Sequence, residues 1–151
     1  MNPLEKTAYC GIFCPDCIRY KNEYSDCASQ LKSRLMNVEF EKYAKVDTPF
    51  GANFNKYDVF MEVLDALSSA QCSNPCRVGG GCSGEQCEIM KCCLSRGFDG
   101  CWDCGEVAGC DKFTILAPRC GEMPKNNILK IKKHGMNDWA AFRDNFYIWQ
   151  E

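Results

Sequence analysis

Most of the cysteines of this chain fall in one stretch, residues 71–110, which reads QCSNPCRVGGGCSGEQCEIMKCCLSRGFDGCWDCGEVAGC. Nine of the fourteen cysteines lie there, and a tighter group, CGIFCPDC, occupies residues 10–17. No cysteine lies between Cys27 and Cys72. Fourteen cysteines in 151 residues is a fraction of about 9%, which is typical of a disulfide scaffold or of metal sites. We therefore expect the rest of the chain to pack around these two cysteine groups.

The flanking sequence favours metal over disulfides. The first nine residues have neither the basic head nor the apolar run of a signal peptide, and no segment approaches the ~20 apolar residues of a membrane span. We expect a cytoplasmic protein without a membrane partner, in which thiols stay reduced and closely spaced cysteines bind metal. The net charge of −2 disfavours nucleic acid as a partner, because phosphates require a basic face.

The cysteine spacing suits zinc, which takes four ligands and accepts two thiolates from one short turn. Cys101 and Cys104 are separated by two residues, and Cys110 follows as a third candidate. Cys87 and Cys92 are five positions apart, and a regular helix would turn their thiols about 140° away from each other. Cys87 must therefore precede the helix if both thiols bind one ion.

The candidate ligands suffice for two or more zinc ions, but spacing does not determine which cysteines share an ion. The predicted ligands are Cys10, Cys14, Cys17, Cys76, Cys82, Cys87, Cys92, Cys101, Cys104, Cys110 and Cys120. We interpret Cys93 and Cys27 as thiols that bind no metal. Cys72 and Cys120 stay open between the two interpretations, and Cys120 is included above because it lies in a predicted turn.

An iron–sulfur cluster is the alternative cofactor. The Cys10, Cys14 and Cys17 spacing is the one by which radical-SAM enzymes hold a [4Fe–4S] cluster, but the chain is too short and too helical for their barrel. The later cysteines lack the ferredoxin run with its Cys-Pro ending. We therefore prefer structural zinc in an interaction or regulatory module with a protein partner. The alternative is an iron–sulfur electron carrier or redox enzyme component. No catalytic residue is assigned, and His134, the only histidine, is expected to interact with the carbonyl end of its helix.

Hydrophobic periodicity and capping signals predict a mostly α fold, a single small cysteine-rich domain over residues 1–151 with helices packed around two or more metal-binding knuckles. Within it we expect a helical insert at about 26–69 and a helical tail at about 125–150. Ser25 or Asp26 would cap the first helix. The predicted helices span residues 26–45, 55–69, 88–96 before Gly97, 125–134 before Gly135, and a last one after Asn137 or Asp138 carrying Trp139, Phe142, Phe146 and Trp149.

The ordered set of motifs resembles a cysteine-rich prokaryotic family catalogued as domain of unknown function 3795. The resembling pieces are CGIFCPDC at 10–17, Gly81-Cys82, CEIMKC at 87–92, CWDC at 101–104, Cys110, NILKI at 127–131, Gly135 and Trp139. The resemblance implies a small cytoplasmic metal-binding protein, with zinc as the metal, and no known reaction. The family often has proline where this chain has Gly109, and often a histidine where this chain has Cys120. If that histidine binds metal in the family, the resemblance implies that Cys120 takes its place.

Overall fold

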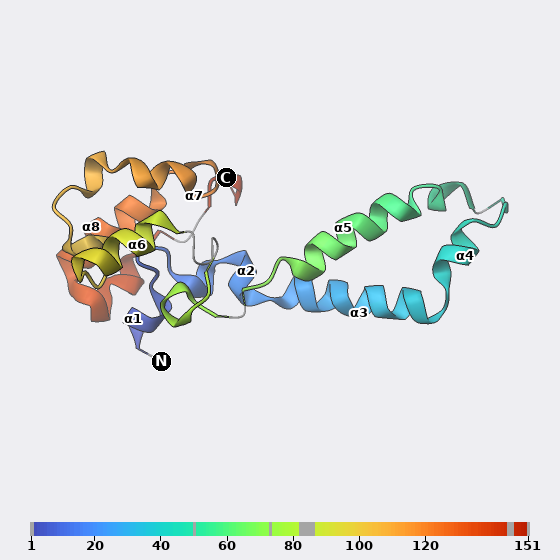
Figure 1. The fold of residues 1–151 in the computed structure, drawn as a ribbon, viewed down its shortest axis with the longest axis horizontal. Helices are drawn as coiled ribbons and strands as arrows, with labels where there is room; N and C mark the ends of the chain where they lie inside the picture. The colour runs from blue at the N-terminus through green and yellow to red at the C-terminus, as the bar shows by residue number, and fades with distance from the viewer. Residues whose placement is uncertain (1, 50, 73, 82–86, 145–146, 151) are drawn as a thin grey trace. The chain divides into compact units, whose positions relative to one another are not determined.

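The computed structural model describes residues 2–49, 51–72, 74–81, 87–144 and 147–150 (Figure 1). The chain divides into two compact units, one formed by residues 1–20 and 72–151 and the other by residues 21–71. Within the described ranges the regular structure is helical, and the only β pairing is an isolated antiparallel bridge between Thr7 and Phe13. The predicted mostly α fold is therefore confirmed. In this part of the chain no helix is both long enough and apolar enough to cross a membrane.

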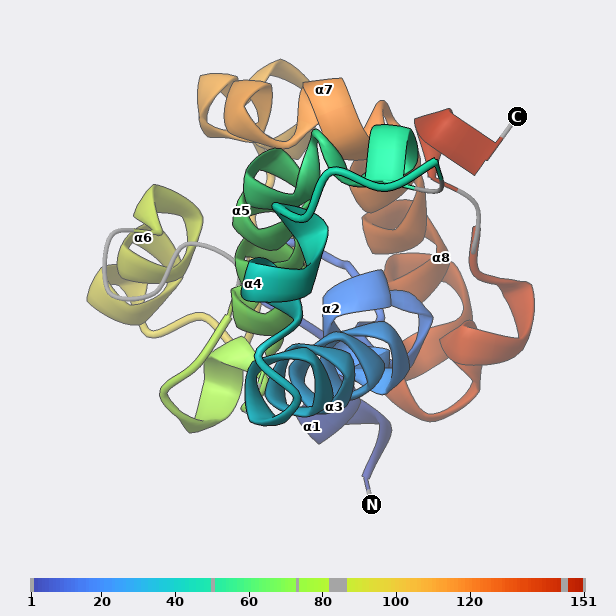
Figure 2. The ribbon, with the colours of Figure 1, turned by 90° about the vertical axis from the view of Figure 1, so that its right-hand side faces the viewer.

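The unit of residues 21–71 is a helical hairpin. Helix α3 (Glu23–Asn37) and helix α5 (Tyr57–Ser69) run antiparallel along one another (Figure 1) and are seen end-on as neighbours in Figure 2. Ala28 and Leu64 are buried between the two helices, and the Tyr24 hydroxyl donates a hydrogen bond to the carbonyl of Ala70. The short helix α4 (Phe40–Ala44) and the 3-10 turn η2 (Gly51–Phe54) connect them.

The predicted helix at 26–45 is wrong in two respects. It begins earlier, at Glu23, so Ser25 lies inside the helix and its hydroxyl donates to the carbonyl of Asn22. It is also interrupted at Glu39, whose φ of 52° is left-handed and ends a right-handed helix. The interruption turns Phe40 towards the aromatic rings of Phe54 and Tyr57, at centroid distances of 5.3 and 5.5 Å.

The other unit carries almost all the cysteines on short elements. It contains α1 (Pro3–Lys6), η1 (Cys14–Asp16), α2 (Ile18–Lys21, at the boundary), η3 (Cys76–Val78), α6 (Glu88–Arg96), η5 (Cys101–Asp103), η6 (Val107–Gly109), η7 (Asp111–Ile115), α7 (Ala117–Cys120) and α8 (Met123–Asp138). Helix α6 has the predicted bounds, with Gly97 at φ 66° as its cap. Helix α8 begins at Met123, and Gly135 breaks it with φ 77° where the sequence predicted an end.

One hydrophobic core fills this unit, and cysteines are part of it. Ile128 and Trp139 are fully buried. Four thiols belong to the core itself, namely Cys10, Cys93, Cys101 and Cys120, and five more pack against it, namely Cys17, Cys76, Cys87, Cys104 and Cys110. The cysteine groups from both ends of the chain therefore meet in one core.

The predicted continuous C-terminal helix is not formed. Two 3-10 turns replace it, η8 (Trp139–Phe142) and η9 (Ile148–Gln150), and Phe146 lies outside the described residues. Trp139 meets Phe13 edge to face at 5.7 Å, so the tail is docked, although Trp149 is half exposed. Phe142 stacks on His134 at 3.9 Å, which gives the histidine ring an aromatic partner. After η8 the backbone is extended at Arg143.

Candidate metal centre

Two turns in the chain share one backbone conformation and one sequence pattern, Cys-x-Asp-Cys. In η1 the backbone N–H of Cys17 donates to the carbonyl of Cys14 at 2.9 Å. In η5 the N–H of Cys104 donates to the carbonyl of Cys101 at 3.1 Å. Each 3-10 turn brings two cysteines to one side of a short loop, which is how zinc knuckles present two thiolates.

The second of these turns also supplies a hydrogen bond to a sulfur. The backbone N–H of Glu106 donates to Cys104 Sγ at 3.4 Å. A donor of this kind holds the sulfur in one orientation. Val107–Gly109 then forms the next turn, closed by the N–H of Cys110 on the carbonyl of Val107 at 3.2 Å. The backbone thus positions Cys104 and Cys110 in consecutive turns.

Five thiols line one small cavity in this region. Its volume is about 30 Å³, and helix α6, turn η5 and the segment at 104–113 enclose it. The cysteines of the lining are Cys92, Cys93, Cys101, Cys104 and Cys110, and none of them is in a disulfide. Ile89, Phe98, Val107 and Phe113 supply most of the remaining wall. A cavity of this size with sulfur donors and an apolar wall is suited to one ion rather than to an organic ligand.

Cys93 and Cys101 are the closest pair of sulfurs on this cavity. Their Sγ atoms lie 3.7 Å apart, and both side chains are buried. Their shared hydrogen bond lowers the pKa of Cys93 and raises the pKa of Cys101, and burial raises the pKa of Cys101 further. The charges of Cys93, Cys10 and Cys110 act on Cys101 in the same direction. With Zn–S bonds of about 2.3 Å, two thiolates on one tetrahedral zinc are about 3.8 Å apart.

The N-terminal cysteine group meets a later cysteine around a buried tyrosine. Tyr147 is 3% exposed, and burial raises the pKa of its hydroxyl. The charge of Cys17, its hydrogen bond and then the charge of Cys120 raise the same pKa further. Tyr147 and Cys120 belong to one core, and Cys17 packs against it. Cys120 is 2% exposed and is the last residue of α7. Cys17 and Cys120, 103 positions apart in the sequence, therefore lie in the same part of the core.

Two arginines connect the segments that carry the two cysteine groups. Arg77, next to Cys76, lies over the rings of Tyr9 at 4.3 Å and Trp102 at 5.3 Å, and its Nε donates to the carbonyl of Thr7 at 2.6 Å. The N–H of Cys101 donates to the carbonyl of Tyr9 at 2.9 Å. These contacts join the segments that carry Cys10, Cys76 and Cys101.

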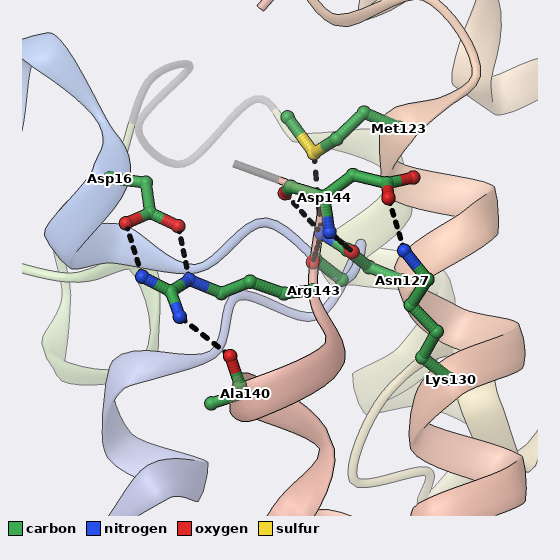
Figure 3. Close-up of polar contacts among 8 residues, drawn as sticks. Asp16, Met123, Asn127, Lys130, Ala140, Arg143 and Asp144 are labelled. Carbon is green, nitrogen blue, oxygen red and sulfur yellow. Dashed lines mark hydrogen bonds and ion pairs between the residues drawn. The ribbon is translucent and has the colours of Figure 1, made fainter. Parts of the chain in front are cut away.

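A second set of polar contacts joins the turn at 14–17 to the C-terminal segment (Figure 3). Arg143 donates two hydrogen bonds to the carboxylate of Asp16, one of them from Nη2 at 2.9 Å. Asn127 is fully buried, accepts the N–H of Asp144 at 2.9 Å and donates to the carbonyl of Gly11 at 3.1 Å. The loop at 10–17 is thereby fixed from two sides by residues outside it.

The arrangement offers the donor atoms and the cavity that a metal site requires, but it does not group the ligands as a bound ion would. Within the described residues, no three cysteine, histidine or acidic side chains are grouped so that they could hold a metal ion as they stand. The donors are of the right type, since thiolates are the ligands that zinc and iron–sulfur clusters prefer. The fit therefore lies in the donor set, the cavity and the knuckle backbones, and ligation would require side chains to rotate inward.

The predicted ligands divide by location. Cys92, Cys101, Cys104 and Cys110 share the small cavity, while Cys10 and Cys17 belong to the same core from the N-terminal side. Cys87 precedes α6 with a non-helical backbone, which is the condition for Cys87 and Cys92 to bind one ion. Cys87 does not line that cavity. Cys14 is half-buried, Cys76 packs against the core from η3, and Cys82 lies outside the described residues.

Cys93 was interpreted as a buried thiol that binds no metal, and it is indeed 2% exposed. The sequence interpretation did not include its position beside Cys101. The signal was available, because Cys93 follows Ile89 by four positions and the buried Ile89 marks the inward face of the helix. Cys27 is exposed on α3, and the Cys72 thiol donates to the carbonyl of Asn74 at 2.9 Å.

Comparison with known proteins identifies a family. Residues 6–115 match the model of the family described as "Protein of unknown function (DUF3795)". The chain belongs to this family. No curated protein and no solved structure matches the chain. The matched range contains both knuckles, the whole hairpin of residues 21–71 and every residue of the small cavity.

Proposed function

We propose that this chain is a metal-binding protein in which Cys93, Cys101, Cys104 and Cys110 hold a structural zinc ion. The observation that carries the proposal is the convergence of five thiols, from three separate elements, on one cavity of about 30 Å³. Buried thiols that merely fill space are usually scattered singly among apolar side chains. Here five of them line one small cavity, and a Cys-x-Asp-Cys turn with an N–H···S hydrogen bond supplies two of them.

The Cys93 and Cys101 sulfurs, which share a hydrogen bond, lie 3.7 Å apart. This is close to the edge of about 3.8 Å expected for two thiolates on one zinc. In a [4Fe–4S] cluster each thiolate binds a different iron, so the sulfurs are held further apart. Zinc also suits a closed site, because it needs no open coordination position when its role is structural.

We further propose that the N-terminal group forms a second centre with Cys14, Cys17 and Cys120 as ligands and Cys10 as the candidate for the fourth. The support is that Cys10 and Cys120 belong to one core, that Cys17 packs against it, and that η1 closes a Cys-x-Asp-Cys turn. The ligands of such a centre come from both ends of the chain, so the ion would close the core of this unit. Metal binding would then be coupled to folding.

The role that follows is that of an interaction or regulatory module stabilised by metal. Both proposed centres lie in the core or against it rather than in an open cleft, which is the setting of structural zinc. An ion in either centre would supply cross-links between chain segments and no acid–base chemistry. The partner of such a module would be a protein.

Elemental analysis of the purified chain tests this proposal, together with absorption spectra of an anaerobic preparation. We expect about two zinc ions per chain and no visible absorbance. Cys93→Ser, Cys101→Ser and Cys104→Ser should each lower the zinc content by about one ion, and Cys27→Ser, on the exposed face of α3, should not. A brown preparation that contains iron and sulfide would overturn the zinc assignment in favour of the electron carrier.

A further inference from the structure

The helical hairpin carries a groove that the metal centres do not explain. It has a volume of about 550 Å³ and runs between α3, α4 and α5. Its floor is apolar and is formed by Leu35, Met36, Phe40, Tyr57 and Met61. Two of these are methionines, whose unbranched side chains adapt to different partners. Two packed helices form one layer, so a groove with an apolar floor beside them is where a third helix would pack.

The rim of the groove is strongly acidic. Five carboxylates, those of Glu39, Glu41, Asp58, Glu62 and Asp65, face two lysines, Lys32 and Lys42, which gives the lining a net charge of −3. Three of the five carboxylates are already paired, Asp65 with Lys32, Glu39 with Lys42, and Glu41 with Lys45, which lies outside the lining. The charge of Asp58 also acts on Lys45. In the described part of the chain Asp58 and Glu62 form no ion pair, and both are exposed. These two carboxylates are available to cations on a partner.

We propose that this groove binds a cationic amphipathic helix of another protein. The lining residues on α5 run from Tyr57 to Asp65, a length of about 12 Å at 1.5 Å per residue, which accommodates about two helical turns. Such a helix would place apolar side chains at i, i+3 or i+4 and i+7 on the floor. Its lysines or arginines would lie along the rim beside Asp58 and Glu62.

The acidic rim determines the class of partner. A segment with acidic flanks would bring like charges together, whereas a basic one gains attraction and a faster encounter. Such an attraction is screened by salt, which gives the complex a measurable signature. This inference goes beyond the metal centres, since every residue of the groove lies within residues 21–71 and every proposed ligand lies outside them.

Fluorescence anisotropy with the full metal-loaded chain tests the inference. The probe is a labelled helical peptide of about 18 residues built from leucine and lysine in an amphipathic pattern, and the comparison peptide has glutamate at every lysine. We expect the lysine peptide to bind, the glutamate peptide not to bind, and affinity to fall as salt is raised from about 50 to 300 mM. The double variant Asp58→Lys with Glu62→Lys should weaken binding about 10-fold or more.

Asp26→Lys is the matched control, because Asp26 is exposed on α3, carries the same charge and does not line the groove. It should change the affinity by less than about 2-fold. Met61→Lys, in the floor, should weaken binding while circular dichroism and zinc content stay unchanged. An equal loss in Asp26→Lys and in the rim variant would overturn the groove as the site, and so would binding of the glutamate peptide. If the chain self-associates and Met61→Lys abolishes this self-association, the groove binds a second copy of the chain. That result would overturn the proposed partner.

Discussion

Arg143 donates two hydrogen bonds to the carboxylate of Asp16, although the two residues are 127 positions apart in the chain (Figure 3). Asp16 lies inside the cysteine knuckle at 14–17, and Arg143 also lies over the ring of Phe13 at 4.7 Å. The pair is largely shielded, with side chains 26% and 16% exposed. The C-terminal segment therefore holds a candidate ligand loop in place from outside.

Replacing Arg143 should destabilise the fold and loosen that loop. A forked, charge-assisted contact of this kind contributes about 1.5–3 kcal/mol, so we expect Arg143→Ala and Asp16→Asn to lower the free energy of unfolding by that amount. The double-mutant cycle, measured by urea denaturation, should give a coupling energy above about 1 kcal/mol. Lys91→Ala removes the exposed pair with Glu88 and serves as the control, with an effect below about 0.5 kcal/mol.

The pH dependence of this pair has a definite sign. Its hydrogen bonds with Asp16 raise the pKa of Arg143 above its ordinary value. A raised pKa in the folded state means that the contribution is fully present below the ordinary arginine pKa and is lost only as strongly alkaline pH passes the raised value. The stability difference between the chain and Arg143→Ala should therefore be constant between about pH 6 and 9. A difference that falls with rising pH within that range would contradict this account.

Asn127 should be one of the most sensitive positions in the chain. It is fully buried on α8, and its amide satisfies the carbonyl of Gly11 and the N–H of Asp144. Asn127→Leu leaves two buried polar groups without a partner, which costs about 2–5 kcal/mol. The neighbouring Asn126→Leu, at an exposed site, should stay within about 0.5 kcal/mol of the unchanged chain in the same thermal or urea unfolding experiment. Similar losses in both variants would refute the hydrogen-bonding role.

Gly11 is required between two candidate ligands for a steric reason. Its φ is +86°, and a Cβ atom there would lie 2.7 Å from the carbonyl oxygen of Pro124 and 3.0 Å from Ile128 Cγ1. Gly11→Ala should therefore cost about 2 kcal/mol or more and should lower the metal content, because the loop carrying Cys10 and Cys14 must shift. Gly109→Ala, where a Cβ meets open space and φ is not positive, is the control. If Gly11→Ala keeps both stability and metal, the close approach of this loop to α8 is not required.

Local signals predicted some elements correctly because local interactions determine them. Helix α6 has the predicted bounds since Gly97 supplies the left-handed cap that ends it. The break at Glu39 could not be predicted, because a left-handed glutamate has no sequence signal and depends on the packing of Phe40. The predicted C-terminal helix does not form for a similar reason, because tertiary contacts outweigh the helical spacing of the aromatic residues. Trp139 is fully buried, Phe142 stacks on His134, and Arg143 pairs with Asp16.

In the candidate site, too, local spacing determines some positions and tertiary packing determines the others. Spacing alone identified Cys101, Cys104 and Cys110 as neighbours, because short turns bring them together whatever the rest of the fold does. The sequence interpretation chose Cys92 over Cys93 as a ligand, and it did not use which face of α6 is buried, the face that carries Cys93. That Cys17 packs against the core to which Cys120 belongs is a product of tertiary packing and has no signature in either segment.

Cys120 provides the sharpest test of the second proposed centre. It is 2% exposed at the end of α7, and Gly121 follows with φ 52° and turns the chain away. If Cys120 is a ligand together with Cys14 and Cys17, Cys120→Ala should lower the zinc content by about one ion per chain. If it only fills the core, the same change should leave the zinc content intact and cost about 1–2 kcal/mol from the lost sulfur contacts.

Two further substitutions separate ligation from packing at this position. Cys120→Ser keeps nearly the same volume but removes the thiolate, so a ligand role predicts loss of zinc while a packing role predicts its retention. Cys120→His offers another zinc ligand, and we expect it to retain zinc if the larger ring can be accommodated in the core. Each variant is measured by elemental analysis after competition with a chelator, with Cys27→Ser as the exposed control. Full zinc content in both Cys120→Ala and Cys120→Ser would remove Cys120 from the site, and the fourth ligand beside Cys10, Cys14 and Cys17 would then have to come from another cysteine.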